Sequence, residues 1–203
     1  MKDLGVRLDC NMSGEPHAKE LIAKCNGRVS FLFRYSSLLN TNTRRILCSS
    51  LVQPLLDYCS SPWYSGFPSR LREKNDVIQR RMVRFVFSYI SRQHVDSHDF
   101  KKLSWMRLSD RVNYFKLLHV FKLRNRLAPV YLSRRFTLVE QEHEYNTHGR
   151  GRNFAITSNI SDSLATFSYT AAILWNGLPS YLKEFTSLNL FRNRLRVYIM
   201  QSY

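Results

Sequence analysis

The sequence predicts a mainly α-helical protein, in which a helical bundle follows one N-terminal strand and a smaller α+β part ends the chain. Three observations support this prediction. Apolar residues recur at a helical period in several segments. Capping residues precede these segments, and proline or turn clusters follow them. Hydrophobic residues make up 44% of the 203 residues, which is enough to fill a packed core.

The N-terminal strand is expected at residues 4–9, with the sequence LGVRLD. Its residues alternate between apolar and small or polar types, which is typical of a half-buried strand. The apolar face consists of Leu4, Val6 and Leu8. A lone strand has no partner. We therefore expect its partner strands to lie upstream in a longer protein, and Met1 not to be a natural domain start.

The first helix is expected to follow Ser13, the predicted cap, and to tolerate Pro16 in its first turn. Its apolar face is Leu21, Ile22, Cys25, Val29, Leu32 and Phe33. The second helix is expected to start at a Thr41 or Asn42 cap. Its apolar stripe is Leu47, Leu51, Leu55 and Tyr58. Pro54 should kink or split this helix, because proline removes a backbone donor and clashes with the preceding turn.

A third helix is expected from Ser69, after the turn cluster CSSPWYSGFP at residues 59–68. Its apolar face is Leu71, Ile78, Met82, Phe85, Val86 and Tyr89. Its basic flank is Arg70, Lys74, Arg80, Arg81 and Arg84. Such runs are often only solvated helix faces, and Lys74 and Arg81 can snorkel. The predominance of arginine favours phosphate binding, because guanidinium groups bind phosphate in a bidentate manner.

Two further helices are expected before residue 130. A short one spans residues 97–103 and is capped by Asp96 or Ser97. A long one starts at Ser109 or Asp110 and ends near Leu127, before Ala128-Pro129. Its packing face is Tyr114, Leu117, Leu118 and Phe121. Its polar flank is Arg111, His119, Lys122 and Arg126, and the positive charge continues at Arg124, Arg134 and Arg135.

The C-terminal part begins with a polar surface loop at residues 139–153, which contains Arg150 and Arg152. One or two strands are expected between residues 151 and 180. A last helix follows a Thr186 or Ser187 cap. Its apolar residues are Leu188, Phe191, Leu195, Tyr198 and Ile199. The chain is thus predicted to have three parts: residues 1–66, a basic helical region at 67–136, and residues 137–203.

The charge predicts an acidic partner. Lys and Arg number 31 against 15 Asp and Glu, so the formal net charge is +16. Nucleic acid is the first candidate, and an anionic membrane surface is the second. The predicted phosphate contacts are Arg70, Lys74, Arg80, Arg81, Arg84, Arg111, Lys122, Arg126, Arg134, Arg135, Arg150 and Arg152. Trp63 and Trp105 are candidates for base stacking, although such residues are more often core anchors.

No catalytic, metal or cofactor motif is present in the sequence. The four cysteines (Cys10, Cys25, Cys48 and Cys59) form no C-x-x-C pair, and Cys25, Cys48 and Cys59 are expected to be reduced core residues. Neither adjacent carboxylates nor a phosphate-binding glycine loop occurs. His94 and His98 are four apart, but they lack the glutamate of the H-E-x-x-H pattern. We therefore expect no catalytic residue, no metal and no cofactor.

No secretory or membrane-spanning segment is expected either. Residues 1–10 are charged where a signal peptide would be apolar, and no apolar run reaches about 18 residues. The sequence therefore predicts an intracellular protein without a membrane-spanning segment, with nucleic acid preferred over a membrane as partner, in either a nuclear or a cytoplasmic ribonucleoprotein.

Several motifs, in this order, resemble the C-terminal region of non-LTR (LINE-type) retrotransposon reverse transcriptases. The likeness covers nearly the whole chain. Its most diagnostic parts are PLLDYC at 54–59 with Trp63, the stop Leu127-Ala128-Pro129, and LWNGLP at 174–179. The resemblance implies the thumb and post-thumb part of such a polymerase. In that family the thumb grips the template–primer duplex, and the C-terminal region helps to hold RNA and target DNA.

The resemblance also implies that the chain is not an enzyme by itself. The family's catalytic carboxylates lie in an aromatic-x-Asp-Asp turn upstream of LGVRLD, and that turn is absent here. In this view the strand at 4–9 completes a palm edge, and an upstream polymerase palm is an expected partner. The leading hypothesis is thus a non-catalytic fragment that binds RNA or DNA through arginine–phosphate contacts. The alternatives are a structural or interaction fragment, a decayed transposon product, and a subunit that complements a separate catalytic chain.

Overall fold

The computed structural model describes residues 2–3, 5–7, 9–10, 13–58, 60–90, 93–133, 136, 153–156, 167–201 and 203. Helices dominate these residues, so the prediction of a mainly α-helical fold with β structure at the N-terminus is confirmed. The chain forms two compact units. The N-terminal unit comprises Met1–Val112 together with Tyr203, and the C-terminal unit comprises Asn113–Ser202. The predicted boundary at 66/67 falls inside the N-terminal unit.

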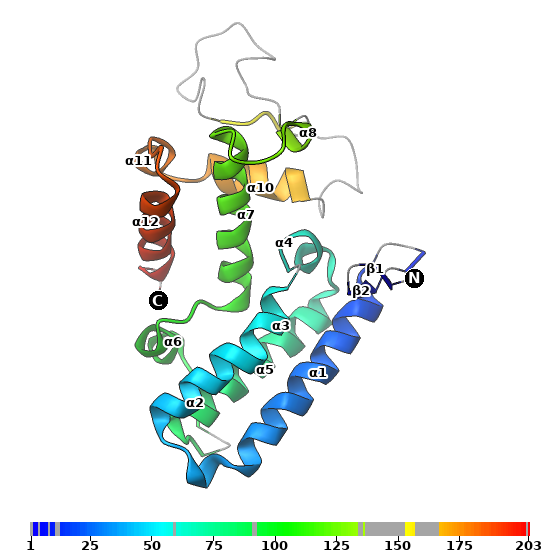
Figure 1. Cartoon of the computed structure of the whole chain (residues 1–203), viewed down its shortest axis with the longest axis vertical. Helices are drawn as coiled ribbons and strands as arrows, with labels where there is room; N and C mark the ends of the chain where they lie inside the picture. The colour runs from blue at the N-terminus through cyan, green and yellow to red at the C-terminus, as the bar shows by residue number, and fades with distance from the viewer. Residues whose placement is uncertain are drawn as a thin grey trace, which may run out of the picture. The chain divides into compact units, whose positions relative to one another are not determined.

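Short strands and helices alternate with longer helices along the chain (Figure 1). The N-terminal unit contains β1 (Lys2–Asp3), β2 (Val6–Arg7), α1 (Glu15–Arg34), η1 (Ser36–Leu38), α2 (Thr41–Leu47), η2 (Cys48–Val52), α3 (Gln53–Asp57), α4 (Ser60–Trp63), η3 (Tyr64–Gly66), α5 (Ser69–Phe87) and α6 (Ser97–Leu103). Helix α7 (Leu108–Arg124) begins in this unit and ends in the next. The C-terminal unit then contains α8 (Val130–Ser133), α10 (Phe167–Asn176), α11 (Ser180–Lys183) and α12 (Leu188–Met200).

The N-terminal β structure is a hairpin rather than one strand over residues 4–9. β1 and β2 pair in antiparallel fashion, with Lys2 opposite Arg7 and Asp3 opposite Val6. Gly5 lies in the turn with φ +82°, a left-handed conformation that glycine adopts without strain. The predicted strand therefore turns at Gly5, and β2 finds its partner within the chain. Leu4 and Leu8, two of the three predicted apolar positions, lie outside the described residues.

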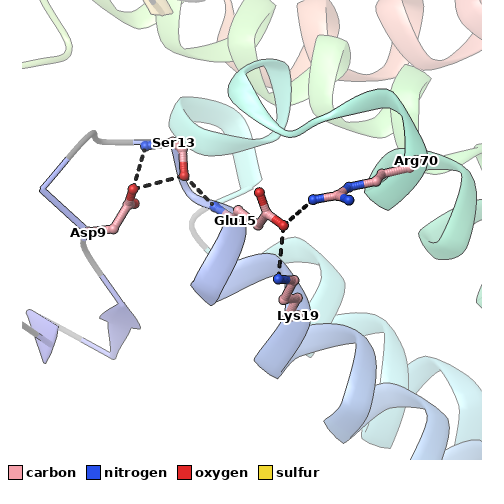
Figure 2. Close-up of polar contacts among 5 residues, drawn as sticks. All are labelled: Asp9, Ser13, Glu15, Lys19 and Arg70. Carbon is pink, nitrogen blue, oxygen red and sulfur yellow. Dashed lines mark hydrogen bonds and ion pairs between the residues drawn. The ribbon is translucent and has the colours of Figure 1, made fainter.

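Helix α1 begins in a small polar network (Figure 2). The Asp9 carboxylate accepts hydrogen bonds from the backbone N–H of Ser13 at 3.2 Å and from its hydroxyl at 2.9 Å. The Ser13 hydroxyl oxygen accepts one from the backbone N–H of Glu15 at 3.2 Å. The N-cap residue itself is Gly14, one position after the predicted Ser13. Pro16 lies in the first turn, as predicted, where its missing N–H costs no helical hydrogen bond.

The second predicted helix is divided at the proline, as expected. Helix α2 passes into the π-helical turn η2, and α3 starts with Pro54 in its first turn. The extra residue of a π turn accommodates the proline ring and its missing donor. The predicted apolar stripe was wrong by about one residue. The buried positions are Cys48, Val52 and Leu56, whereas Leu51 and Tyr58 are 39% and 51% exposed.

The caps of the short helices differ in how well the sequence identified them. Helix α2 is capped by Asn40, whose side-chain oxygen accepts a hydrogen bond from the backbone N–H of Thr43 at 2.8 Å. The predicted caps, Thr41 and Asn42, lie inside the helix. Helix α6 has the predicted bounds and an Asp96 cap, which forms a reciprocal capping box with Asp99.

The core of the N-terminal unit lies among α1, the α2–η2–α3 segment and α5, which run side by side in Figure 1. Five of the six residues predicted for the apolar face of α5 are buried, with Ile78 and Val86 fully inaccessible. The sixth, Tyr89, is half-buried and follows the end of the helix. Cys25 and Cys48 are also inaccessible, in agreement with their interpretation as core residues. Trp105 belongs to the same core. One hydrophobic core therefore includes residues from both sides of position 66.

The C-terminal unit has its own aromatic core. Phe121 of α7 stacks on Phe191 of α12, with ring centroids 4.3 Å apart and planes at 15°. The fully buried Trp175 of α10 lies 5.9 Å from Phe191. The side-chain amide of Asn176 donates to Phe154 O at 2.8 Å, and its oxygen accepts from Phe154 N at 2.9 Å.

The strands predicted between residues 151 and 180 are not found in the described part of that segment. Helix α10 occupies Phe167–Asn176, and Phe154 is a single bridged residue. The apolar residues of α10 follow a helical period, because Ala171, Ala172 and Trp175 all face the core. Over residues 167–176 the expectation of a strand is therefore wrong, and residues 157–166 lie outside the described part of the chain. The final helix, with Phe191 and Leu195 buried, agrees with the prediction.

We predict that Asn40→Ala lowers the free energy of unfolding by about 1 kcal/mol, because the Thr43 N–H loses its cap. Asn42→Ala is the matched control, because Asn42 is exposed inside α2 and should change stability by less than about 0.5 kcal/mol. Urea denaturation of both variants measures the difference. An equal loss from both would contradict the assignment of the cap.

Candidate nucleic-acid interface

Helix α5 carries five of the predicted phosphate contacts, and its arginines differ in their surroundings. Arg70 forms an ion pair with Glu15 of α1 (Figure 2). Glu15 also pairs with Lys19 at 2.9 Å, and these two bases together lower the pKa of its carboxyl. The Arg70 side chain is 65% exposed, so the pair is screened by water and Arg70 can still approach an external anion.

Arg81 and Arg84 are held more firmly. The Arg81 guanidinium donates to the side-chain oxygen of Asn26 and, at 3.0 Å, to the Ser30 hydroxyl, both on α1. Arg84 Nε donates to the backbone oxygen of Gln93 at 3.2 Å. These contacts join α5 to neighbouring segments. A phosphate would have to replace them, which indicates a structural role for both side chains.

Lys74 and Arg80 are the predicted α5 residues that remain available. Both are exposed and have no hydrogen bond or ion pair within the described part of the chain. Arg72 has the same properties and was missed in the sequence, because it lies on a different side of the helix from the other basic residues. The exposed basic set of α5 is therefore Arg72, Lys74 and Arg80, with Arg70 beside it.

Arg80 also lines a cavity of about 380 Å³ between α5, the segment before α6 and the start of α7. Arg107 lines it too, donating to the Ser97 hydroxyl at 2.7 Å and lying 5.8 Å from the Phe100 ring. Two carboxylates, Asp76 and Asp96, share this cavity. Burial raises the pKa of Asp76, and the guanidinium groups of Arg80 and Arg107 oppose that shift. Because both carboxylates and guanidinium groups line it, the cavity does not select an anion.

Arg111 has a structural role as well. Its guanidinium forms a two-point contact with the Asp57 carboxylate, in which Nη2 and Oδ2 are 2.6 Å apart. Both side chains are largely shielded, at 28% and 20% exposure. This geometry is the strongest that an Arg–carboxylate pair adopts. Arg111 therefore fixes the start of α7 to the end of α3 within the N-terminal unit.

The C-terminal unit has a pronounced positive charge. Its described residues include eight lysines and arginines but one carboxylate, that of Glu184. The eight bases are Lys116, Lys122, Arg124, Arg126, Lys183, Arg192, Arg194 and Arg196. Of the predicted contacts, Lys122 and Arg126 have no hydrogen bond or ion pair within the described residues. Arg134, Arg135, Arg150 and Arg152 lie outside the described residues.

The two tryptophans proposed for base stacking have different outcomes. Trp105 is only 7% exposed and packs in the core of the N-terminal unit. Base stacking requires an accessible ring face, so the structure favours the alternative interpretation of Trp105 as a core anchor. The side chain of Trp63 lies outside the described part of the chain.

Two buried lysines were not identified in the sequence. Lys116 Nζ donates to the Thr170 hydroxyl at 2.7 Å, and burial lowers the pKa of its ammonium to about 8. Lys183 Nζ donates to Asn176 O at 2.8 Å and to Asn153 Oδ1 at 3.0 Å. A lysine at an apolar helix face is a weak sequence signal, because the long side chain usually snorkels to water. These two therefore support the packing of the unit rather than a contact surface.

Reactive groups are scarce in the described part of the chain. No three His, Cys, Asp or Glu side chains there come close enough together to hold a metal ion. Burial raises the pKa of both the Cys25 and the Cys48 thiol to about 12, so both stay protonated and poorly nucleophilic at neutral pH. Cys10 is exposed, and Cys59 lies outside the described residues. Among the helices that the structure describes, none combines the length and the apolarity of a membrane span.

Comparison of the chain with protein-family models, with curated proteins and with solved structures finds no match. The resemblance to non-LTR reverse transcriptases therefore stays a prediction from the sequence motifs.

We predict that Lys116→Met changes the pH dependence of stability between about pH 8 and pH 10.5. In this range the folded amine is deprotonated while the unfolded chain still binds the proton, so Lys116 makes the free energy of unfolding rise with pH. In the variant this rise should be absent, and the difference should reach up to about 3 kcal/mol.

Urea denaturation at several pH values measures this difference, and subtraction of the wild-type curve removes the effects of other titrating groups. Lys122→Met, a change of a more accessible lysine on the same helix, is the control. Equal pH dependence of the Lys116→Met variant and the wild type would contradict the burial of the amine.

Proposed function

We propose that this protein binds RNA or DNA through the phosphate backbone and does not catalyse a reaction by itself. One observation carries the proposal: accessible basic side chains without a hydrogen bond or an ion pair in the described structure occur in both units. They are Arg72, Lys74 and Arg80 of α5, Lys122 and Arg126 at the end of α7, and Arg192 and Arg194 of α12. Unpaired surface cations attract polyanions and release condensed counterions on binding.

The division among the α5 bases supports a phosphate-binding role for some of them. If the basic flank only braced α5 against its neighbours, all of its members would be expected to resemble Arg81 and Arg84, which bond to neighbouring segments. Lys74 and Arg80 do not. The charged groups of Lys74 and Arg80 stay hydrated in the free protein, so they can neutralise phosphates without first breaking an internal contact. Contacts of this kind position a nucleic acid without reading its bases.

The motif order supports a narrower form of the proposal. By resemblance, the chain is the thumb and post-thumb part of a non-LTR retrotransposon reverse transcriptase, and the ligand is the template–primer duplex. The missing aromatic-x-Asp-Asp turn supports the absence of catalysis by this chain. An upstream polymerase palm is then the protein partner, and a nuclear or cytoplasmic ribonucleoprotein is the site of action.

A structural or interaction role is the second candidate, and one observation favours it. Around the end of α1 and in η1, Phe31, Tyr35 and Leu38 are 54%, 47% and 80% exposed. Exposed apolar groups that lie close together are typical of protein contacts. Light scattering without nucleic acid separates the two candidates. A monodisperse monomer at low and high salt supports nucleic-acid binding, and concentration-dependent association supports the interaction role.

We predict that Lys74→Gln combined with Arg80→Gln weakens binding to a labelled RNA–DNA hybrid duplex. Because two phosphate contacts are removed, the slope of log affinity against log salt should fall in magnitude by about 2. Fluorescence anisotropy over a salt series measures both effects. Arg81→Gln is the matched control, since it should lower stability through its lost contacts to α1 but leave the slope unchanged.

A flat salt response of the wild-type protein would overturn the proposal. An unchanged slope in the double variant would remove α5 from the interface.

A further inference from the structure

A cavity of about 240 Å³ lies between α7 and α12, within the C-terminal unit. It is lined by Phe115, Leu118, His119, Lys122, Leu188 and Arg192. The ring stack of Phe121 on Phe191 holds the two helices together beside this cavity. Lys122 and Arg192 directly follow these phenylalanines in the chain, so the stack also fixes where the two bases lie. The site is thus built on packed helices rather than on loops.

The polar residues that line this cavity are basic. Among the described residues, Lys122 and Arg192 line it, no carboxylate does, and neither base has a hydrogen bond or an ion pair. His119 Nδ1 is 2.8 Å from the carbonyl oxygen of Phe115. A carbonyl oxygen only accepts, so Nδ1 carries the proton of this bond and Nε2 is left for another partner. Charge complementarity therefore favours an anion, in contrast to the mixed cavity beside Arg107.

The other lining residues are apolar, namely Phe115, Leu118 and Leu188. Phe115 is half-buried, so part of its ring is accessible. An aromatic ring beside two aliphatic side chains suits the flat face of a nucleobase, which stacks without regard to sequence. Inorganic phosphate alone would leave these side chains in water. The cavity therefore has cationic side chains that can bind an anion and apolar side chains that can contact a planar ring.

We propose that this cavity binds one unstacked nucleotide of a single-stranded segment, with its phosphate on Lys122 and Arg192 and its base against Phe115. The volume decides between strand states, because a paired base cannot enter a cavity of this size without leaving its stack. This inference rests on the proposed nucleic-acid function and makes it specific: the C-terminal unit prefers single strands, whereas α5 contacts the backbone of any strand.

The test compares a labelled oligothymidylate single strand with a labelled hairpin duplex that has the same number of phosphates. Lys122→Gln combined with Arg192→Gln should weaken single-strand binding about tenfold and reduce its salt slope by about 1.4, the value for two contacts to a single strand. Phe115→Leu should weaken single-strand binding with little change in slope, because it removes stacking and no charge. Phe115→Leu should leave duplex binding unchanged, and the charge variant should weaken duplex binding less than single-strand binding. Arg196→Gln is the control, because Arg196 is an exposed arginine of α12 that neither lines the cavity nor belongs to the bases proposed to contact phosphate.

A second measurement does not depend on the fold of the variants. Uridine monophosphate titrated into the wild-type protein should shift the methyl resonances of Leu188 and Leu118, whereas inorganic phosphate should shift them much less. Equal losses of single-strand and duplex binding in the variants, or no methyl shift with the nucleotide, would overturn the inference. If duplex binding still depends on Lys74 and Arg80, then the proposed function stands and only the cavity assignment fails. If the wild-type protein binds neither ligand, both fail.

Discussion

The N-terminal unit depends on the packing of α5 along α1. Apolar residues of both helices, such as Val29 and Ile78, share one buried core, and removal of this apolar surface from water is the main stabilising term. At the rim of the same contact, Arg81 donates to Asn26 and Ser30, and Arg70 pairs with Glu15. The contact therefore decides both where α5 lies and which of its basic side chains are still accessible.

This division of the arginines has a functional consequence. A side chain that bonds across a helix contact is ordered before any ligand arrives, but its donors are already used. Arg81, Arg84 and Arg111 belong to this class. Lys74 and Arg80 keep their donors for an external acceptor. Counting the positive charges on these helices therefore overestimates the number of side chains that can contact phosphate.

The C-terminal unit also divides its basic residues between packing and accessible charge, but it does so around an aromatic contact. Its stacked phenylalanines join α7 and α12, and its bases lie around this joint with one carboxylate among the described residues. Two lysines are buried and bonded, to Thr170 and to Asn176 and Asn153, while Lys122 and Arg192 face a cavity. Arg124 lies 5.7 Å from the Trp175 ring, so it contributes to the aromatic core as well. Within this one unit, some basic residues thus take part in packing, while others remain accessible.

The sequence by itself determined the helical class, the apolar faces of α5 and α12, the capping box of α6 and the break at Pro54. Each of these follows from interactions between residues that are close in the chain, where side-chain period and local hydrogen bonding decide the outcome. It also determined the sign of the charge and hence the class of partner proposed.

Only the tertiary structure decided which basic side chains already form hydrogen bonds or ion pairs within the protein, because Arg81, Arg84 and Arg111 find their partners on other elements. It likewise decided that the N-terminal segment turns at Gly5, that the buried stripe beyond α2 shifts to Cys48, Val52 and Leu56, and that Trp105 is a core residue. The physical reason is the same in each case. Burial and pairing depend on neighbours distant in sequence, which a local pattern does not contain.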